Sequence, residues 1–97
     1  MSRTHTPHVV FYTRPGCHLC EEAEREIEAA RCRPLYTFEK INVETDPDLT
    51  RRYGYDIPVV TVDGTVAFKH RLAADDFKRA VKSAAIARNA GGTRSRR

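Results

Sequence analysis

Two cysteines separated by two residues, Cys17 and Cys20, are the side chains of this sequence best suited to chemistry. They lie in the stretch FYTRPGCHLCEE, directly after a run of bulky apolar residues. In a reducing compartment, a close cysteine pair is more often catalytic or metal-binding than part of a structural disulfide framework. At the start of a helix, this spacing brings the two Cα atoms to about 5 to 6 Å, within the range that a disulfide requires. The spacing therefore predicts a pair that can open and close with little backbone motion.

The two thiols are not equivalent, because only Cys17 is expected at the helix start. Unpaired backbone N–H groups and the helix dipole favour negative charge there, so the pKa of Cys17 should lie below the roughly 8.5 of a free thiol. Arg14 and His18 add positive potential, and the glutamates that follow oppose it from solvent. Cys20 is expected one turn inside, where burial raises the pKa of a thiol. We predict that Cys17 is the attacking thiolate.

A strand and a helix position this pair. The apolar run within His8–Thr13 predicts a central strand covered on both faces. From His18 onward, small and apolar residues recur at helical spacing among glutamates, and Pro34 is predicted to end the helix. The recurring positions are Cys20, Ala23, Ile27 and Ala30.

Four further elements follow along the chain. Residues 36–43 predict a second strand, and TDPDLTRRYG predicts a short helix capped by Asp46 and stopped by Gly54. Asp63 and Gly64 lie between two β-rich runs, which predicts an antiparallel hairpin. A last amphipathic helix follows, with Phe77, Ala80, Val81 and Ala84 on one stripe.

The predicted order is β-α-β-α-β-β-α, which makes an α/β fold with a four-stranded mixed sheet and helices on both faces. With 97 residues and 40% hydrophobic content, the chain suits one domain. We assign residues 1–7 to a flexible N-terminus, residues 8–89 to the domain and residues 90–97 to a flexible basic tail after the last apolar stripe.

The motifs FYTRPGCHLC and DIPVVTVDG, in this order, resemble those of the glutaredoxin-like family of the thioredoxin superfamily, over about residues 8–88. The resemblance implies a thioredoxin fold in which Cys17 attacks a disulfide and Cys20 resolves the mixed disulfide. It also implies that Pro58 is cis and faces the sulfurs. A proline that opens a strand is independently best explained as a turn or edge device, since it lacks the N–H that a central strand needs.

Two departures from the family pattern affect the substrate site. The stretch FKHRLAADDF lacks the Gly-Gly pair of members that use glutathione, and Asp56 replaces the usual threonine. Basic residues are expected at the same end of the sheet as Cys17 and form a substitute rim. The predicted substrate-binding residues are Arg14, Ile57, Pro58, Lys69, His70 and Arg71, and His18 and Asp56 are predicted to modulate the pKa of the thiols.

The main competing function is a metal or iron–sulfur cluster binding module on the same fold. Zinc usually takes four ligands, and only His18 and His70 are plausible additions to the pair, so we predict no metal site and no built-in cofactor. Two further hypotheses are a pair of thiols buried in the core and an interaction domain whose thiols are vestigial. Cys32, about 18 Å along the helix from Cys20, is predicted to be a partly exposed thiol outside the pair.

The charge balance and hydropathy of the chain indicate which kinds of partner and compartment to expect. The chain has 17 Lys and Arg against 13 Asp and Glu, and four arginines in residues 88–97 account for the excess. A balanced domain gives little support for nucleic-acid binding. No apolar run reaches the roughly 20 residues of a membrane helix, and residues 1–7 lack a secretory signal. We therefore expect a cytoplasmic monomer, with a disulfide-containing protein or a low-molecular-weight thiol as substrate and a thiol or flavoprotein reductase as electron donor.

Overall fold

The computed structural model describes residues 5–32 and 35–90, with the backbone alone for residues 87–90. Its elements follow the predicted order, with one additional short 3-10 helix before α2. They are β1 (His8–Thr13), α1 (His18–Ala30), β2 (Thr37–Asn42), η1 (Val43–Thr45), α2 (Pro47–Tyr53), β3 (Val59–Val62), β4 (Thr65–Lys69) and α3 (Ala74–Ala90).

The four strands form one mixed sheet in the order β2-β1-β3-β4. β1 pairs parallel with β2 and antiparallel with β3, so it is a central strand, as its apolar run predicts. Val9 and Phe11 are fully buried in it. Asp63 and Gly64 join β3 to β4 with φ angles of 53° and 85°, the positive values of a two-residue hairpin turn. The hairpin prediction is confirmed.

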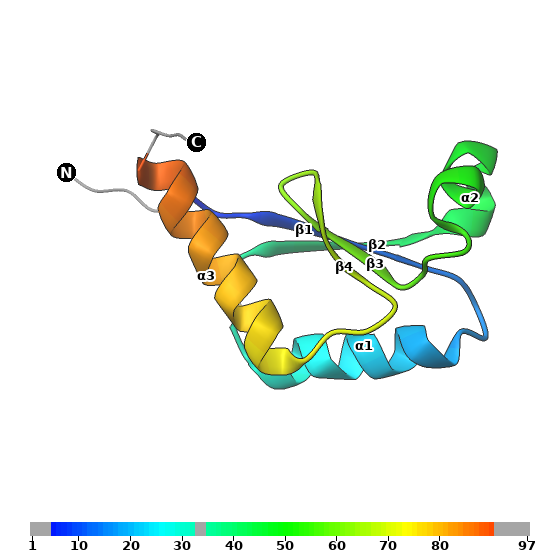
Figure 1. Cartoon of the computed structure of the whole chain (residues 1–97), viewed down its shortest axis with the longest axis horizontal. Coiled ribbons are helices and arrows are strands. Elements are labelled where there is room, and N and C mark those ends of the chain that lie inside the picture. The colour runs from blue at the N-terminus through cyan, green and yellow to red at the C-terminus, as the bar shows by residue number, and fades with distance from the viewer. Residues whose placement is uncertain (1–4, 33–34, 91–97) are drawn as a thin grey trace.

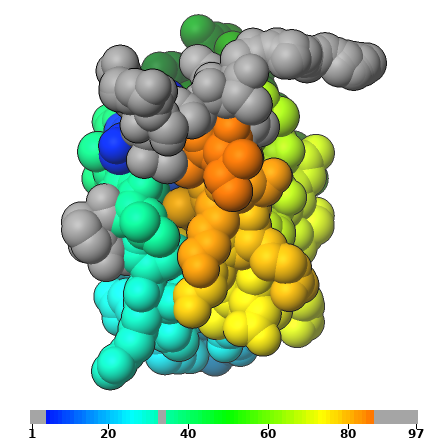
Figure 2. All heavy atoms as spheres, turned by 90° about the vertical axis from the view of Figure 1, so that its left-hand side faces the viewer, coloured from blue at the N-terminus to red at the C-terminus, as the bar shows by residue number. Residues whose placement is uncertain are grey.

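The main core lies between one face of the sheet and helices α1 and α3 (Figure 1). Phe77 of α3 meets the ring of Tyr36 edge-on, with 5.3 Å between ring centroids. Figure 2 shows α3 beside the segment that follows α1 on the same side of the molecule. These contacts tie α3 to the far end of the helix that carries the cysteine pair.

The other face of the sheet is covered at one end by α2 (Figure 1). The rings of Tyr12 and Tyr53 contact each other there at a tilt of 32°, with 4.5 Å between centroids. Burial is the main reason that the pKa of Tyr12 is raised above its ordinary value. Helices on both faces of a four-stranded mixed sheet confirm the predicted fold class.

Helix α1 ends earlier than predicted and in a different way. Its last residue is Ala30, and Arg31 adopts a left-handed conformation with φ 53° while its N–H donates to the Glu28 carbonyl. This reverses the chain, so Cys32 turns back into the core and is 3% exposed. The predictions that Pro34 ends the helix and that Cys32 is partly exposed are wrong. Pro34 itself lies outside the described residues.

Two other boundaries differ in detail. The second strand is shorter than residues 36–43, because Val43 already begins η1. Gly54 follows α2 as predicted, but with a right-handed φ of −56°. A Cβ on Gly54 would come within 2.4 Å of the Thr50 carbonyl oxygen. The glycine therefore allows its backbone to lie close to the Thr50 carbonyl.

Residues 5–7, assigned by the sequence to a flexible N-terminus, are attached to the domain. The Pro7 carbonyl accepts the Thr37 N–H at 2.9 Å, and His5 Nε2 lies 2.9 Å from the Asp63 carboxylate. Residues 5 and 7 thus contact the strands of the sheet and the hairpin turn. Residues 1–4 and most of the predicted basic tail, residues 91–97, lie outside the described residues.

Candidate redox site

Cys17 occupies the N-cap position of α1. Its sulfur accepts a hydrogen bond from the Cys20 backbone N–H at 3.1 Å, so it takes up one of the donors that a helix start leaves unpaired. The side chain is half-buried, behind a turn in which Gly16 has φ 78°. A sulfur at this place faces the positive end of the helix dipole, which stabilises a thiolate in the reduced protein.

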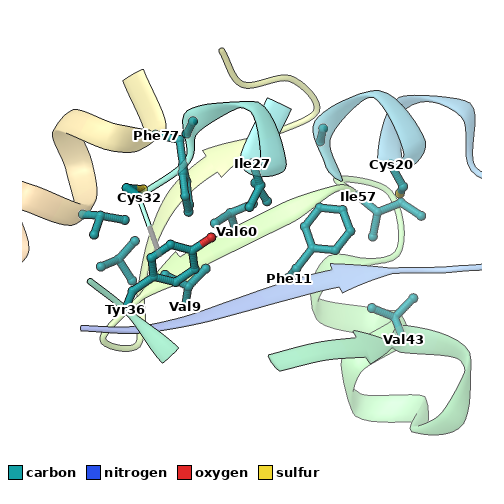
Figure 3. Packing of buried hydrophobic residues seen from close by; sticks show 14 residues of the cluster. Val9, Phe11, Cys20, Ile27, Cys32, Tyr36, Val43, Ile57, Val60 and Phe77 are labelled. Carbon is teal, nitrogen blue, oxygen red and sulfur yellow. The ribbon is translucent and has the colours of Figure 1, made fainter. Parts of the chain in front are cut away.

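Cys20 forms a disulfide with Cys17, and the two Cα atoms are 5.2 Å apart. Cys20 is 3% exposed and belongs to the apolar stripe of α1 together with Ala23 and Ile27. Figure 3 places Cys20 at the same end of the core as Ile57. The pair therefore consists of one accessible sulfur and one sulfur at the edge of the core.

The loop before β3 contains the predicted cis bond between Ile57 and Pro58. The Pro58 carbonyl accepts the N–H of His70 at 2.8 Å, which ties this loop to the end of β4. Because β1 and β3 are antiparallel, the end of β1 and the start of β3 lie at the same end of the strands, which is the end that Cys17 follows. The Ile57 and Pro58 side chains are themselves buried, so they shape the loop more than they offer side-chain surface.

Four of the charged residues singled out by the sequence lie beside a residue of opposite charge: Asp56, Lys69, His70 and His18. The Asp56 carboxylate lies 3.4 Å from Lys69 Nζ and 3.7 Å from His70 Nε2, so Lys69, the last residue of β4, offsets its negative charge. The His18 side chain is 91% exposed and lies 4.0 Å from Glu21. His18 is thus a surface residue at the start of α1.

Two grooves flank different faces of α1. A groove of about 430 Å³ is lined by Cys17 and Cys20 and includes Arg14 at its rim. A second groove, of about 680 Å³, is lined by His70 and Arg71 but by neither cysteine. The structure therefore places Arg14 beside the sulfurs and separates it from His70 and Arg71.

Three further residues of the cysteine groove were missed by sequence reasoning: Glu24, Lys40 and Asn42. Lys40 Nζ lies 2.9 Å and 3.2 Å from the two Glu24 carboxylate oxygens and joins β2 to α1. The helical spacing of four from Cys20 could have indicated Glu24. Lys40 and Asn42 required the register of β2 against β1, which the sequence does not specify.

Within residues 5–32 and 35–90, no group of three or more His, Cys, Asp or Glu side chains is arranged to hold an ion. In the same part of the chain, no helix is both long enough and apolar enough to cross a membrane.

Comparison with known sequences extends this description. The model of the glutaredoxin-like domain (DUF836) matches residues 8–82. The glutaredoxin-like protein YDR286C homolog of Dictyostelium discoideum is 34% identical over 71 residues. That match includes 67% of this chain and 66% of the relative, so the chain spans about two thirds of the length of this protein.

Solved structures show the same fold. The NMR structure of protein Ne2328 from Nitrosomonas europaea has a TM-score of 0.67 at 26% identity, over 82% of this chain and 96% of that one. Chloroplastic thioredoxin z has a TM-score of 0.69 at 20% identity, over 84% of this chain and 80% of its own. The fold is thioredoxin-like, and its cysteine pair at disulfide distance fits a redox function.

Proposed function

We propose, from the premise that this chain belongs to the glutaredoxin-like domain family, that it is a dithiol thiol–disulfide oxidoreductase. It reduces protein disulfides or mixed disulfides through Cys17 and Cys20. The observation that supports this most directly is the position of the Cys17 sulfur, which caps α1 and is bonded to Cys20. The pair needs no additional group to carry two electrons.

The first step is attack by the Cys17 thiolate on a substrate disulfide. A bond forms between the Cys17 sulfur and one substrate sulfur, and the other substrate sulfur leaves as a thiolate. The helix start stabilises the attacking charge, and the half-buried position of Cys17 leaves the sulfur accessible to substrate. The rim residue Arg14 offers a cation at the same groove.

The second step is resolution by Cys20. Its sulfur attacks Cys17, the intramolecular disulfide forms, and the remaining substrate sulfur leaves as a thiolate. A Cα separation of 5.2 Å allows this bond without rearrangement of α1. An external electron donor, a low-molecular-weight thiol or a reductase, then returns the pair to the dithiol state. A reducing compartment such as the cytoplasm fits this cycle.

A trapping experiment tests the proposal. Reduced protein is mixed with a disulfide-containing protein, and products are separated under non-reducing conditions. Cys20→Ser should accumulate a mixed disulfide through Cys17, because the resolving thiol is gone. Cys17→Ser should form no adduct and show no turnover. Turnover by Cys17→Ser at the wild-type rate, or no turnover by the wild type with any disulfide, would refute the function.

A further inference from the structure

The start of helix α3 is stabilised by a side chain from α1. The Phe77 N–H donates to the Ala73 carbonyl at 2.9 Å, which places Ala73 at the N-cap position of α3. An alanine methyl group cannot accept a hydrogen bond from the helix start. The Ala74 N–H instead donates to Glu26 Oε1 at 2.9 Å. A carboxylate from another helix thus does the work of a cap, and Figure 1 shows the start of α3 beside α1.

Glu26 supplies the negative charge that this helix start favours. Unpaired N–H groups and the positive end of the dipole make the start of a helix a binding place for anions. Glu26 is half-buried, whereas Ala73 beside it is exposed. The anion-binding start of α3 therefore lies near the surface and already holds a carboxylate of the chain itself.

The start of α3 borders the larger of the two grooves beside α1, the one of about 680 Å³. Leu19 and Glu26 line this groove from α1, and residues 70–73 line it from the segment before α3. Leu19 lies between the two cysteines in the sequence, and the His70 N–H donates to the Pro58 carbonyl of the cis-proline loop. The groove therefore extends from beside the cysteine pair to the start of α3.

A polypeptide bonded to Cys17 is long enough to follow this groove. Glu26 lies nine residues after Cys17, which corresponds to about 13 Å along α1. Three extended residues beside the substrate cysteine span about 10 Å, and their side chains add the remaining distance. The flanking residues of a protein disulfide can thus reach the start of α3.

An acidic flanking residue finds that start already filled. Its carboxylate must either displace Glu26 from the Ala74 N–H or lie beside a like charge, and both cost free energy. A neutral or basic residue meets neither cost. Resting on the proposed function, we propose that Glu26, by filling the start of α3, makes this chain select protein disulfides with neutral or basic flanking residues over those with acidic ones.

The other charges of the groove do not account for such a selection. Both signs are present among them, so their effects on a passing carboxylate oppose one another. Glu26 differs from them because it is half-buried and bonded to α3. The discrimination is therefore local to the helix start. The further titratable side chains that line the groove, all of them exposed, are Glu22, Arg25, His70, Arg71 and Asp76.

Two matched peptide disulfides test this assignment. Each is the symmetrical disulfide of a peptide with a central cysteine, flanked on both sides by three glutamates in one peptide and by three glutamines in the other. The rate constant for reduction of each by the reduced protein is followed by acid quenching and chromatography. The selectivity is the ratio of the glutamine to the glutamate rate constant. Division by the same ratio for dithiothreitol removes the intrinsic reactivity of the peptides.

The wild type should have a corrected selectivity above one. Glu26→Ala should lower it about two- to fivefold, the range that one charge at a helix start contributes, through faster reduction of the glutamate peptide alone. Glu26→Gln should lower it less, because its amide oxygen still accepts the Ala74 N–H. Glu22→Ala is the matched control, since it removes the same charge from the same groove, and should leave the selectivity as in the wild type.

Each alternative result has a distinct meaning. A wild-type selectivity of one or below, or an unchanged selectivity in Glu26→Ala, would overturn the assignment. An equal fall in Glu22→Ala would also overturn it, because net charge would then explain the effect. If Glu26→Ala does not fold, as judged by circular dichroism, an unchanged selectivity in Glu26→Gln overturns it. A wild type that reduces neither peptide would instead contradict the proposed dithiol function.

Discussion

One cysteine lies at the start of helix α1 and another just beyond its end. The two side chains differ in their exposure and in what surrounds them. Cys17 caps the first turn, is half-buried and lines a groove together with its disulfide partner. Cys32 follows a left-handed residue, is 3% exposed and belongs to the hydrophobic core. Figure 3 shows Cys20 and Cys32 at opposite ends of that core.

The difference lies in what the two ends of α1 offer a thiol. The start of α1 offers backbone N–H groups and the positive end of the dipole, and both favour a thiolate. Beyond the end of α1, Cys32 is 3% exposed, belongs to the hydrophobic core and has no such helix start beside it. One helix is thus capped by one cysteine and followed by another that lies in the core.

The largest expected effect of breaking this arrangement is on stability. Ile27→Ala removes a side chain that is 1% exposed in the middle of α1 and leaves a cavity beside the core. We expect the free energy of unfolding to fall by about 2 to 5 kcal/mol, measured by urea denaturation of the reduced protein. The rate of Cys17 alkylation in the folded variant should not change. A loss of that reactivity would mean that core packing, and not the helix start, activates Cys17.

A smaller effect is expected at Cys32. Cys32→Ser places a hydroxyl, which is costlier to desolvate than a thiol, inside the core. We expect a loss of about 1 to 3 kcal/mol in the free energy of unfolding, with disulfide turnover retained below the melting temperature. Cys32→Ala serves as the control for lost volume and should cost less than the serine. Abolished turnover in both variants would place Cys32 in the redox mechanism.

The smallest effect concerns the residue that turns Cys32 inward. Arg31 has φ 53° and ψ 44°, a conformation that disfavours side chains with a Cβ. Arg31→Gly should raise the free energy of unfolding by roughly 0.5 to 1 kcal/mol, because glycine adopts this conformation freely. Ala29→Gly, on an exposed helical position, is the control and should lower it by a similar amount. Equal destabilisation by both glycines would contradict this account of the helix end.

The sequence predicted those features that depend on local signals. The apolar run of β1, the Asp63-Gly64 turn and the position of Cys17 before α1 each follow from neighbouring residues, and the structure confirms them. The end of α1 could not be predicted in this way. Arg31 has no preference for a left-handed conformation, so its residue type gives no local signal for the turn at this position.

In the redox site, too, local sequence signals predicted some residues and missed those that only the tertiary fold brings together. Cys17 and Cys20 were evident from their spacing, whereas the ion pair of Glu24 and Lys40 joins residues 16 positions apart on a helix and a strand. The proposed rim of Arg14, Lys69, His70 and Arg71 was inferred from strand direction alone. Strand direction places residues at one end of a sheet but does not tell which face of α1 they flank.

The central claim is that the start of α1 makes Cys17 the reactive thiol of this chain. The most direct test is alkylation of the reduced wild-type protein with iodoacetamide at mildly acidic pH, followed over time by peptide mass spectrometry. The account predicts that Cys17 is labelled first and Cys20 more slowly, and that Cys32 is labelled only after the protein unfolds. Faster labelling of Cys20 or Cys32 than of Cys17 in the folded protein would contradict it.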